Sequence, residues 1–155
     1  MISEMKNKRR QLDFNGALQI LIDGEYGVLA TNGKGGYNYA TPLNYVYVDG
    51  NLYFHGALEG HKMDNIAMSN NVSFCVVGRT QVLPSKFTAK YESVIVFGKA
   101  FIAGEEEKRK VLTAFIKKYS PCYEQQGENY INRASRYTCV VRMEVEQLTG
   151  KAAMY

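Results

Sequence analysis

The sequence predicts a mainly β protein, in which an antiparallel barrel of six or seven strands carries helices at its periphery. An Asp-Gly pair at positions 49–50 separates two alternating segments, which is typical of a tight two-residue β-hairpin. Residues 139–146 alternate apolar and polar side chains, as a strand with one buried face does. Strands and helices do not alternate regularly along the chain, so a parallel, doubly wound sheet is not expected.

The length and composition fit one globular domain. The 155 residues are 46% hydrophobic and 22% charged, and they contain no repeat, low-complexity tract or linker. We therefore expect residues 1–155 to form a single domain. The N-terminal residues lack the apolar run of a signal peptide, and no stretch of about 18 apolar residues occurs. These features predict a cytoplasmic protein that does not bind membranes.

Charge and cysteine content exclude several other classes. The net charge of +4 is mild, and the basic residues between positions 6 and 10 accompany no nucleic-acid-binding motif. We expect either a solvated segment or a clamp for a small anion there, and no nucleic-acid partner. Cys75, Cys122 and Cys139 are widely spaced and form no C-x-x-C pair. Neither a disulfide framework nor a metal site is predicted.

The N-terminal part predicts one helix and two strands. Asp13 can cap a helix whose apolar residues recur at helical spacing, and Gly24 can end it. Strands are expected over 26–31 and from about 39 to 48, with a glycine-rich turn between them. Pro42 lies inside the second of these strands and has no N–H to donate, so this strand is predicted to be an edge strand or bulged.

The Asp-Gly turn also predicts the register of its hairpin, because a two-residue turn fixes which residues oppose each other. The expected pairs are Val48 with Asn51, Val46 with Tyr53 and, further from the turn, Asn44 with His55.

The second half of the chain predicts further strands and a well-defined helix. Strands are expected over 72–77 and 93–103, with Gly98 as a bulge. Three glutamates then open a helix that closes with two lysines, the order that the helix dipole favours, and Pro121 ends it. A polar excursion with a short helix near Tyr130 precedes the last strand.

The segment after the hairpin is the candidate site for an anion. Gly56, Ala57 and Gly60 are small enough to let a ligand approach the backbone. The helix that begins near Gly60 offers free N–H groups, and His61 and Lys62 add donors and charge. A phosphate group fits this arrangement, although an ordinary solvated helix start explains it too.

His55 lies immediately before this loop and is the candidate functional histidine, with a purely structural role as the alternative. Backbone groups freed near Pro42 could bind the polar edge of a planar ring, but a simple edge strand explains Pro42 equally well. The chain carries no dinucleotide-binding glycine pattern, no P-loop and no catalytic-serine elbow.

Six segments form an ordered set of motifs that covers nearly the whole chain. They are YGVLAT at 26–31, TPLNY at 41–45, YFHGA at 53–57, GHK at 60–62, YESVIVFG at 91–98 and LTGK at 148–151. In this order they resemble the pyridoxamine 5'-phosphate oxidase-like family of FMN-binding split barrels, and most closely its 5-nitroimidazole resistance branch.

The resemblance implies a split β-barrel homodimer with FMN at the subunit interface. Carried over by position, the residues that would present backbone to the isoalloxazine are Pro42, Leu43, Asn44 and Tyr45, and those lining the flavin are Phe54, His55, Gly56 and Ala57. His61 and Lys62 would hold the phosphate, where the family often has Arg, and Tyr91 and Ser93 would approach the cofactor across the dimer.

The function that this resemblance implies is an FMN-dependent oxidoreductase that reduces a small planar electrophile, with nitroimidazoles and other nitroaromatics as candidate substrates. His55 would be the catalytic residue, donating a proton to the substrate or orienting it. Two alternatives remain open. One is a flavin-binding carrier or sensor without turnover, because no other acid–base group stands near the expected ring. The other is haem binding or breakdown, with His55 or His61 as an iron ligand.

Overall fold

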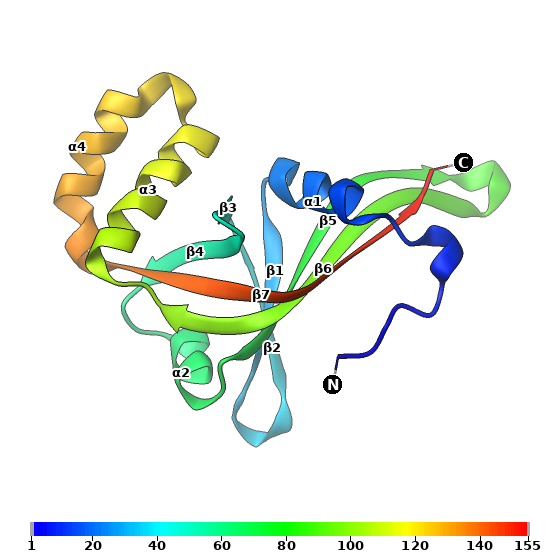
Figure 1. Cartoon of the computed structure of the whole chain (residues 1–155), viewed down its shortest axis with the longest axis horizontal. Coiled ribbons are helices and arrows are strands. Elements are labelled where there is room, and N and C mark those ends of the chain that lie inside the picture. The colour runs from blue at the N-terminus through cyan, green and yellow to red at the C-terminus, as the bar shows by residue number, and fades with distance from the viewer. Residues whose placement is uncertain (1, 155) are drawn as a thin grey trace.

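Seven antiparallel strands form one curled sheet in the order β2-β1-β5-β6-β7-β4-β3 (Figure 1). The computed structural model describes residues 2–154, so Met1 and Tyr155, the ends of the predicted domain, lie outside the described residues. The strands are β1 (Gly27–Asn32), β2 (Asn38–Leu43), β3 (Val46–Val48), β4 (Asn51–Ala57), β5 (Asn71–Leu83), β6 (Thr88–Ile102) and β7 (Thr138–Ala153). The prediction of an antiparallel barrel with six or seven strands is confirmed.

The two edges of this sheet are joined by only two residues, Asn44 and Tyr45, which link β2 to β3. The single strand expected over 39–48 is therefore wrong, although the prediction that Pro42 lies in an edge strand is confirmed. Because such a link spans no more than about 10 Å, the sheet must curl until its edges approach. The sheet becomes a barrel that stays split between β2 and β4.

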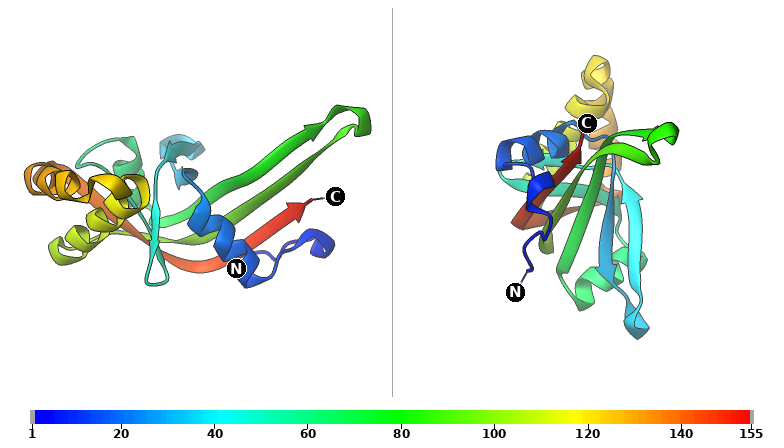
Figure 2. Two further views of the ribbon diagram at one scale, coloured as in Figure 1. Left: turned by 90° about the horizontal axis from the view of Figure 1, so that it is seen from above. Right: turned by 90° about the vertical axis from the view of Figure 1, so that its right-hand side faces the viewer.

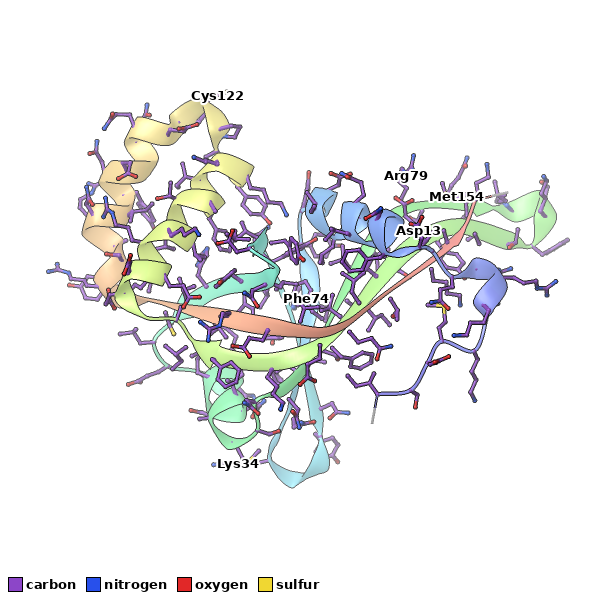
Figure 3. All side chains as sticks on the ribbon, viewed as in Figure 1. Asp13, Lys34, Phe74, Arg79, Cys122 and Met154 are labelled. Atoms are coloured by element: carbon purple, nitrogen blue, oxygen red, sulfur yellow. The ribbon has the colours of Figure 1, made fainter. Side chains whose placement is uncertain are left out.

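The barrel interior holds the main hydrophobic core. Its largest fully buried side chains include Tyr45, Phe54 and Phe74, and Figure 3 marks Phe74 near the centre of the sheet. Helix α1 (Phe14–Asp23) covers one end of this core, and its residue Ala17 packs against Gly150 of β7. Helix α2 (His61–Met68) contributes Met63 and Ile66 to the same core.

A second apolar cluster lies outside the barrel, between the sheet and two further helices. Helix α3 (Glu105–Tyr119) and helix α4 (Glu124–Ala134) pack on each other and cover Val46, Tyr53 and Val140 (Figures 1 and 2). The short helix expected near Tyr130 is α4, which is 11 residues long. Because of this cover, Val140 is only 1% exposed although it faces away from the barrel interior.

Local signals in the sequence predicted several elements correctly. Asp13 caps α1 by accepting a 2.7 Å hydrogen bond from the N–H of Gly16, and Gly24 ends the helix. Asp49 and Gly50 have φ values of 49° and 82°, the positive angles that a type I′ hairpin turn requires. The turn sets the predicted pairs, with Val48 opposite Asn51 and Val46 opposite Tyr53.

The predicted pair of Asn44 with His55 is not formed. Strand β3 begins at Val46, and Asn44 lies in the link between the two sheet edges. The Asn44 side chain instead donates a 2.8 Å hydrogen bond to the carbonyl oxygen of Glu25. The register holds only while both strands continue, so it ends where the chain crosses the split.

The predicted irregularity at Gly98 is confirmed, and it changes which residues face inward. Phe97 pairs with Gln147 but Gly98 pairs with Val145, so β7 carries one extra residue at this point. A Cβ at Gly98 would lie 2.0 Å from the carbonyl oxygen of Glu144. The close approach of the two backbones requires glycine here.

Strands β5 and β6 are longer than the predicted 72–77 and 93–103, and their ends form an arm that projects beyond the barrel (Figure 2). The arm ends in a turn with Phe87, which has a φ of 50° and is 97% exposed. The polar residues of this arm do not alternate with apolar ones as in a half-buried strand, so the sequence did not predict the extra length. Among residues 2–154, no helix is long and apolar enough to cross a bilayer.

We expect Gly98→Ala to destabilise the fold by about 2 kcal/mol, because the added Cβ must force β6 away from β7. Equilibrium urea unfolding measures the change. Gly104→Ser is the matched control, since Gly104 has no neighbour within 4 Å and precedes α3 with extended backbone, where serine can cap the helix. Equal unfolding midpoints for the two variants would contradict the account of the bulge.

Candidate functional site

The candidate site lies at the split, where the first turn of α2 bridges the open edges of β2 and β4. Tyr39 of β2 stacks on the His61 ring, with centroids 4.2 Å apart and planes 30° apart. On the other side, the Lys62 ammonium lies 2.7 Å from where a Cβ of Gly56 in β4 would be. Two consecutive residues of α2 therefore contact strands that are not neighbours in the sheet.

The start of α2 is fixed in place and leaves its N-terminal N–H groups without a side-chain cap. Gly60 precedes the helix with a φ of 138°, which glycine adopts easily, and no side chain caps this end. Deeper in the helix, Asn65 is 2% exposed and donates a 3.0 Å hydrogen bond to the Thr31 hydroxyl of β1. The predicted loop and helix start are confirmed, and the helix presents its positive end at the split.

Lys62 is a half-buried cation that lacks a partner. Within residues 2–154, its ammonium group makes no hydrogen bond or ion pair. It occupies the space that a side chain at position 56 would fill, so Gly56 is needed to receive it. A cation held this way is suited to bind an anion that the chain itself does not supply.

Thr41 adds a second unsatisfied polar group. Its hydroxyl oxygen is buried and has no hydrogen-bond partner in the part of the chain that the structure describes. Thr41 is opposite Leu29 in the β1–β2 ladder, and it shares a face of β2 with Tyr39, two residues away. A buried polar atom without a partner is uncommon in folded proteins and suggests a ligand contact. Sequence reasoning missed this residue, although it opens one of the motifs described above.

His55 follows Phe54, which is fully buried, and points toward α3 rather than toward Asn44. Its ring packs edge-on against Phe115, with centroids 4.6 Å apart. Although the residue is exposed, this packing desolvates the ring and, together with the charge of Lys62, lowers the pKa of His55 below its ordinary value of 6.5. His55 is therefore neutral at pH 7. Any stability that depends on the neutral ring is full above pH 6.5 and falls as the pH drops below it.

The segment that links the sheet edges is already engaged at Tyr45. The Tyr45 N–H donates to the Tyr119 hydroxyl at 3.1 Å, and its carbonyl accepts hydrogen bonds from Tyr119 at 2.7 Å and Lys118 at 3.2 Å. The Tyr45 side chain is fully buried, and its hydroxyl donates to the carbonyl of Leu21 at 2.5 Å. Pro42 and Asn44 are exposed, while Pro42 and Leu43 are opposite Val28 and Gly27 in the β1–β2 ladder.

Tyr91 and Ser93 lie elsewhere in the subunit, on the outward face of β6. Arg10 donates a 3.2 Å hydrogen bond to the Tyr91 hydroxyl, and the Lys151 ammonium is 5.7 Å from the ring centroid. The hydrogen bond from Arg10 is the main reason that the pKa of Tyr91 is lowered, and Lys151 contributes. Within one subunit these residues are not part of the site that α2 bridges.

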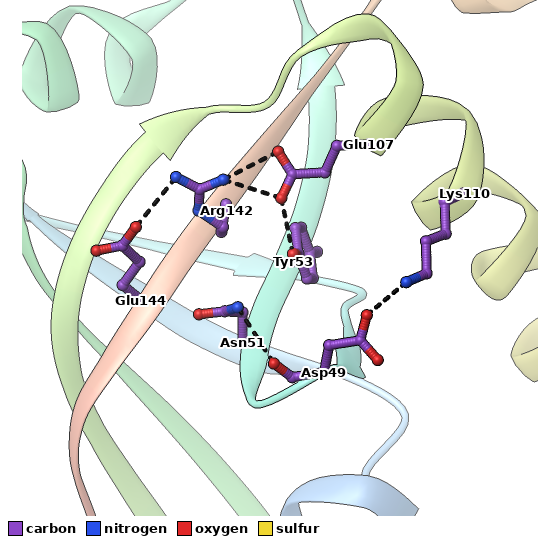
Figure 4. Close-up of polar contacts among 7 residues, drawn as sticks. All are labelled: Asp49, Asn51, Tyr53, Glu107, Lys110, Arg142 and Glu144. Carbon is purple, nitrogen blue, oxygen red and sulfur yellow. Dashed lines mark hydrogen bonds and ion pairs between the residues drawn. The ribbon is translucent and has the colours of Figure 1, made fainter.

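Helix α3 is held against β4 and β7 by a polar network (Figure 4). Glu107 accepts hydrogen bonds from Tyr53 at 2.8 Å and from Arg142 at 3.0 Å, and Arg142 also contacts Glu144 at 3.0 Å. Burial and the Glu107 carboxylate raise the pKa of Tyr53 to about 12, so its hydroxyl stays a donor. This network fixes the position of Phe115, which contacts His55, and of Lys108, which the sequence reasoning did not select.

Comparison with known proteins identifies the family. The sequence profile of pyridoxamine 5'-phosphate oxidase matches residues 15–152. The chain belongs to the pyridoxamine 5'-phosphate oxidase family. The resemblance inferred from the six motifs is thus confirmed, and so is the split-barrel fold. A comparison with curated proteins gave no match.

Several solved structures share the fold at low sequence identity. A candidate 5-nitroimidazole antibiotic resistance protein from Bacteroides thetaiotaomicron is 23% identical, with a TM-score of 0.75 over 92% of this chain and 86% of that one. A FAD-binding protein from Mesorhizobium loti is 24% identical, with a TM-score of 0.70 over 93% and 97%. A FAD and haem binding protein from Mycobacterium smegmatis is 17% identical, with a TM-score of 0.80 over 93% and 73%.

The electrostatic influence of Lys62 on His55 can be tested directly. We expect Lys62→Met to raise the pKa of His55, because the variant removes a neighbouring positive charge. The value should stay below 6.5, since the larger cause, desolvation, remains. NMR titration of the imidazole resonances measures it. Lys110→Met is the control, because Lys110 pairs with Asp49 at the hairpin turn. An unchanged pKa in Lys62→Met would show that the two groups are not neighbours.

Proposed function

We propose that this chain is a cytoplasmic flavoprotein that binds FMN at the split and acts as an oxidoreductase on a small planar electrophile. The observation that carries the proposal is the unpaired Lys62 ammonium, held over Gly56 at the uncapped start of α2. The buried Thr41 hydroxyl without a partner fits the same ligand. Two structures that share the fold are named as FAD-binding, which supports a flavin here.

The phosphate end of the ligand belongs at α2. A phosphate placed there receives N–H groups from the first turn of the helix and the positive end of its dipole. Lys62 would neutralise part of its charge, and His61, held by its stacking on Tyr39, would donate a hydrogen bond. The position of the helix, fixed by Asn65, sets where the phosphate lies.

The ring end belongs along the two open strand edges. Main-chain groups of Pro42, Leu43 and Asn44 at the end of β2 would contact the polar edge of the isoalloxazine, and the Thr41 hydroxyl would gain its missing partner. On the opposite edge, the residues that would line the ring are Phe54, His55, Gly56 and Ala57. Small residues at the end of β4 let a flat group lie against the backbone.

A flavin bound there would supply the electron transfer. The chain contributes an imidazole at His55, which in its neutral form would hold the electrophile through its N–H group and in its protonated form would pass a proton to it. Because the pKa of His55 is lowered, the protonated form becomes abundant only on the acid side of neutrality. Nitroaromatics, including nitroimidazoles, are the substrates we propose, and the likeness to a candidate nitroimidazole resistance protein supports this choice.

We also propose a homodimer with the flavin at the interface. The outward faces of β5 and β6 expose apolar residues, among them Val77 at 58% and Ile95 at 41%. Tyr91 and Ser93 share this face, so a second copy packed on it would bring them to the partner's split. An open split also leaves a planar ligand in contact with water, and a second subunit would exclude that water.

A second candidate function is a flavin carrier or sensor without turnover. It is favoured by the neutral state of His55, since a neutral imidazole is a poor general acid at pH 7. Haem binding, with His55 or His61 as ligand, is a third. The absorption spectrum of the purified protein separates a two-band flavin profile from a Soret peak.

We expect Lys62→Met to weaken FMN binding about ten- to hundredfold, the loss of one charge-assisted contact to the phosphate. Riboflavin, which has no phosphate, should bind both proteins equally. Fluorescence titration of the apoprotein with each ligand measures the difference, and Lys110→Met should behave as the wild type. Parallel losses for both ligands would place Lys62 at the ring instead of the phosphate.

We expect His55→Ala to retain FMN but to slow its reoxidation by a nitroimidazole about a hundredfold, the typical effect of losing a general acid. Stopped-flow mixing of the reduced protein with the nitroimidazole, across a range of pH, measures the rate. In the wild type, the rate should rise as the pH falls through the lowered pKa of His55. If reoxidation is no faster than with buffer alone, the nitroreductase proposal fails. If His55→Ala reacts as the wild type does, His55 is not the proton donor.

A further inference from the structure

Lys108 is a buried cation on the apolar face of α3. The residue is 6% exposed, and it precedes Val111 and Leu112 by three and four positions, the spacing of one helix face. These neighbours pack in the cluster between α3 and the sheet. A lysine at such a position usually extends its ammonium group to solvent, yet only 8% of this side chain is exposed.

The single ion pair of Lys108 does not explain its burial. Its ammonium lies 3.3 Å from a carboxylate oxygen of Glu105, whose side chain is 89% exposed and belongs to the same helix turn. Pairs of this kind contribute little to stability because water screens the exposed partner. Removing an ammonium group from water is unfavourable unless strong contacts replace the lost hydration.

The chain directs Lys108 and Lys62 to the same pair of strand ends. Helix α3 begins beside the start of β7, where the N–H of Ala103 donates a 2.9 Å hydrogen bond to the carbonyl of Val140. The preceding residue, Cys139, is directly opposite Gly56 of β4. Since Lys62 lies over Gly56, one lysine reaches this pair from α2 and the other from α3.

The pKa of the Cys139 thiol is affected by both lysines. Burial raises the pKa of this thiol, and the positive charges of Lys108 and Lys62 both oppose the rise. Among residues 2–154, the ion pairs of these two lysines comprise only the contact with Glu105. The two cations thus approach the same pair of strand ends, with a single, exposed carboxylate to balance them.

We propose that Lys108 is the second cation of the anion site at the end of β4. In the free protein Glu105 forms an ion pair with Lys108, and a phosphate group replaces the Glu105 carboxylate when it binds. The proposal rests on the proposed function only in taking the phosphate to be that of a flavin mononucleotide. A phosphate monoester carries nearly two negative charges at neutral pH, which Lys62 and Lys108 together would match. The exposed Glu105 side chain can rotate into solvent when the anion binds.

Inorganic phosphate tests the site without any flavin. Isothermal titration and the ³¹P NMR shift would be measured on the wild type and three variants. We expect Lys108→Met to weaken phosphate binding about tenfold, and Glu105→Gln to strengthen it severalfold by removing the competing carboxylate. Lys117→Met, an exposed lysine on the same helix, is the control and should match the wild type. If Lys108 only supported the fold, Lys108→Met and Glu105→Gln would not change the phosphate affinity in opposite directions.

A stability measurement separates binding from folding. Methionine suits a buried helix position, so Lys108→Met should unfold at the same urea concentration as the wild type or a higher one. If it does not fold, Lys108→Arg, which should retain phosphate affinity, and Glu105→Gln still test the site. Phosphate affinity that is unchanged in Lys108→Met, or unchanged in Glu105→Gln, would overturn the proposal.

A parallel titration with FMN and riboflavin distinguishes this inference from the proposed function. We expect Lys108→Met to weaken FMN about tenfold and to leave riboflavin unchanged. If inorganic phosphate responds as expected but FMN does not bind the wild type, the anion site stands and the flavin proposal fails. If FMN binds the wild type and Lys108→Met equally well, the flavin proposal stands and the role of Lys108 fails.

Discussion

The architecture depends on one covalent constraint, the two-residue link between opposite edges of a seven-stranded sheet. Asn44 and Tyr45 are too few to cross a flat sheet, so the sheet must curl until β2 and β3 approach. Helix α3 reinforces the link, because Tyr119 contacts both the N–H and the carbonyl of Tyr45. The edges are thus tied together at one end only, and towards the other end β4 continues past β3 with one edge unpaired.

The open end of the split explains why the candidate site is polar and cationic. Edge strands expose unpaired N–H and C=O groups, which proteins normally cover to prevent pairing with another chain. Here α2 covers them incompletely. The apolar residues of α2 pack into the barrel core, while its first turn, with His61 and Lys62, spans the gap between β2 and β4. A helix N-terminus and a lysine at the same place give a positive potential, and among residues 2–154 no side chain caps the helix or forms an ion pair with Lys62. Under the proposed function, the ligand completes both the hydrogen bonding of the edges and the charge balance.

The sequence predicted what local chemistry determines. The capping Asp13, the Asp49–Gly50 turn and the glycine at position 98 each need a particular residue type for a local conformation, and each is found as expected. The break between β2 and β3 was missed because Asn44 and Tyr45 continue the alternation of the strand. Their departure is caused by contacts with α1 and α3, far away in the sequence.

The candidate site likewise combines residues that the local sequence predicts with residues that only distant contacts bring in. The loop and lysine at 56–62 were selected from the sequence alone, whereas Lys108, as proposed above, would come to the site only through tertiary packing. A faint signal was present, namely a lysine on the apolar stripe of α3.

The state of His55 follows from the same electrostatics and limits how the site can work. Packing on Phe115 and repulsion by Lys62 both favour the neutral ring, so the free protein holds few protons on His55 at pH 7. An anion bound near Lys62 would offset the repulsion and raise the proton affinity of the imidazole, since a neighbouring negative charge favours the charged form. Binding of a phosphorylated ligand and protonation of His55 are therefore linked, and each must strengthen the other. In this arrangement the histidine becomes a better proton donor only when the ligand is in place, which ties proton transfer to an occupied site.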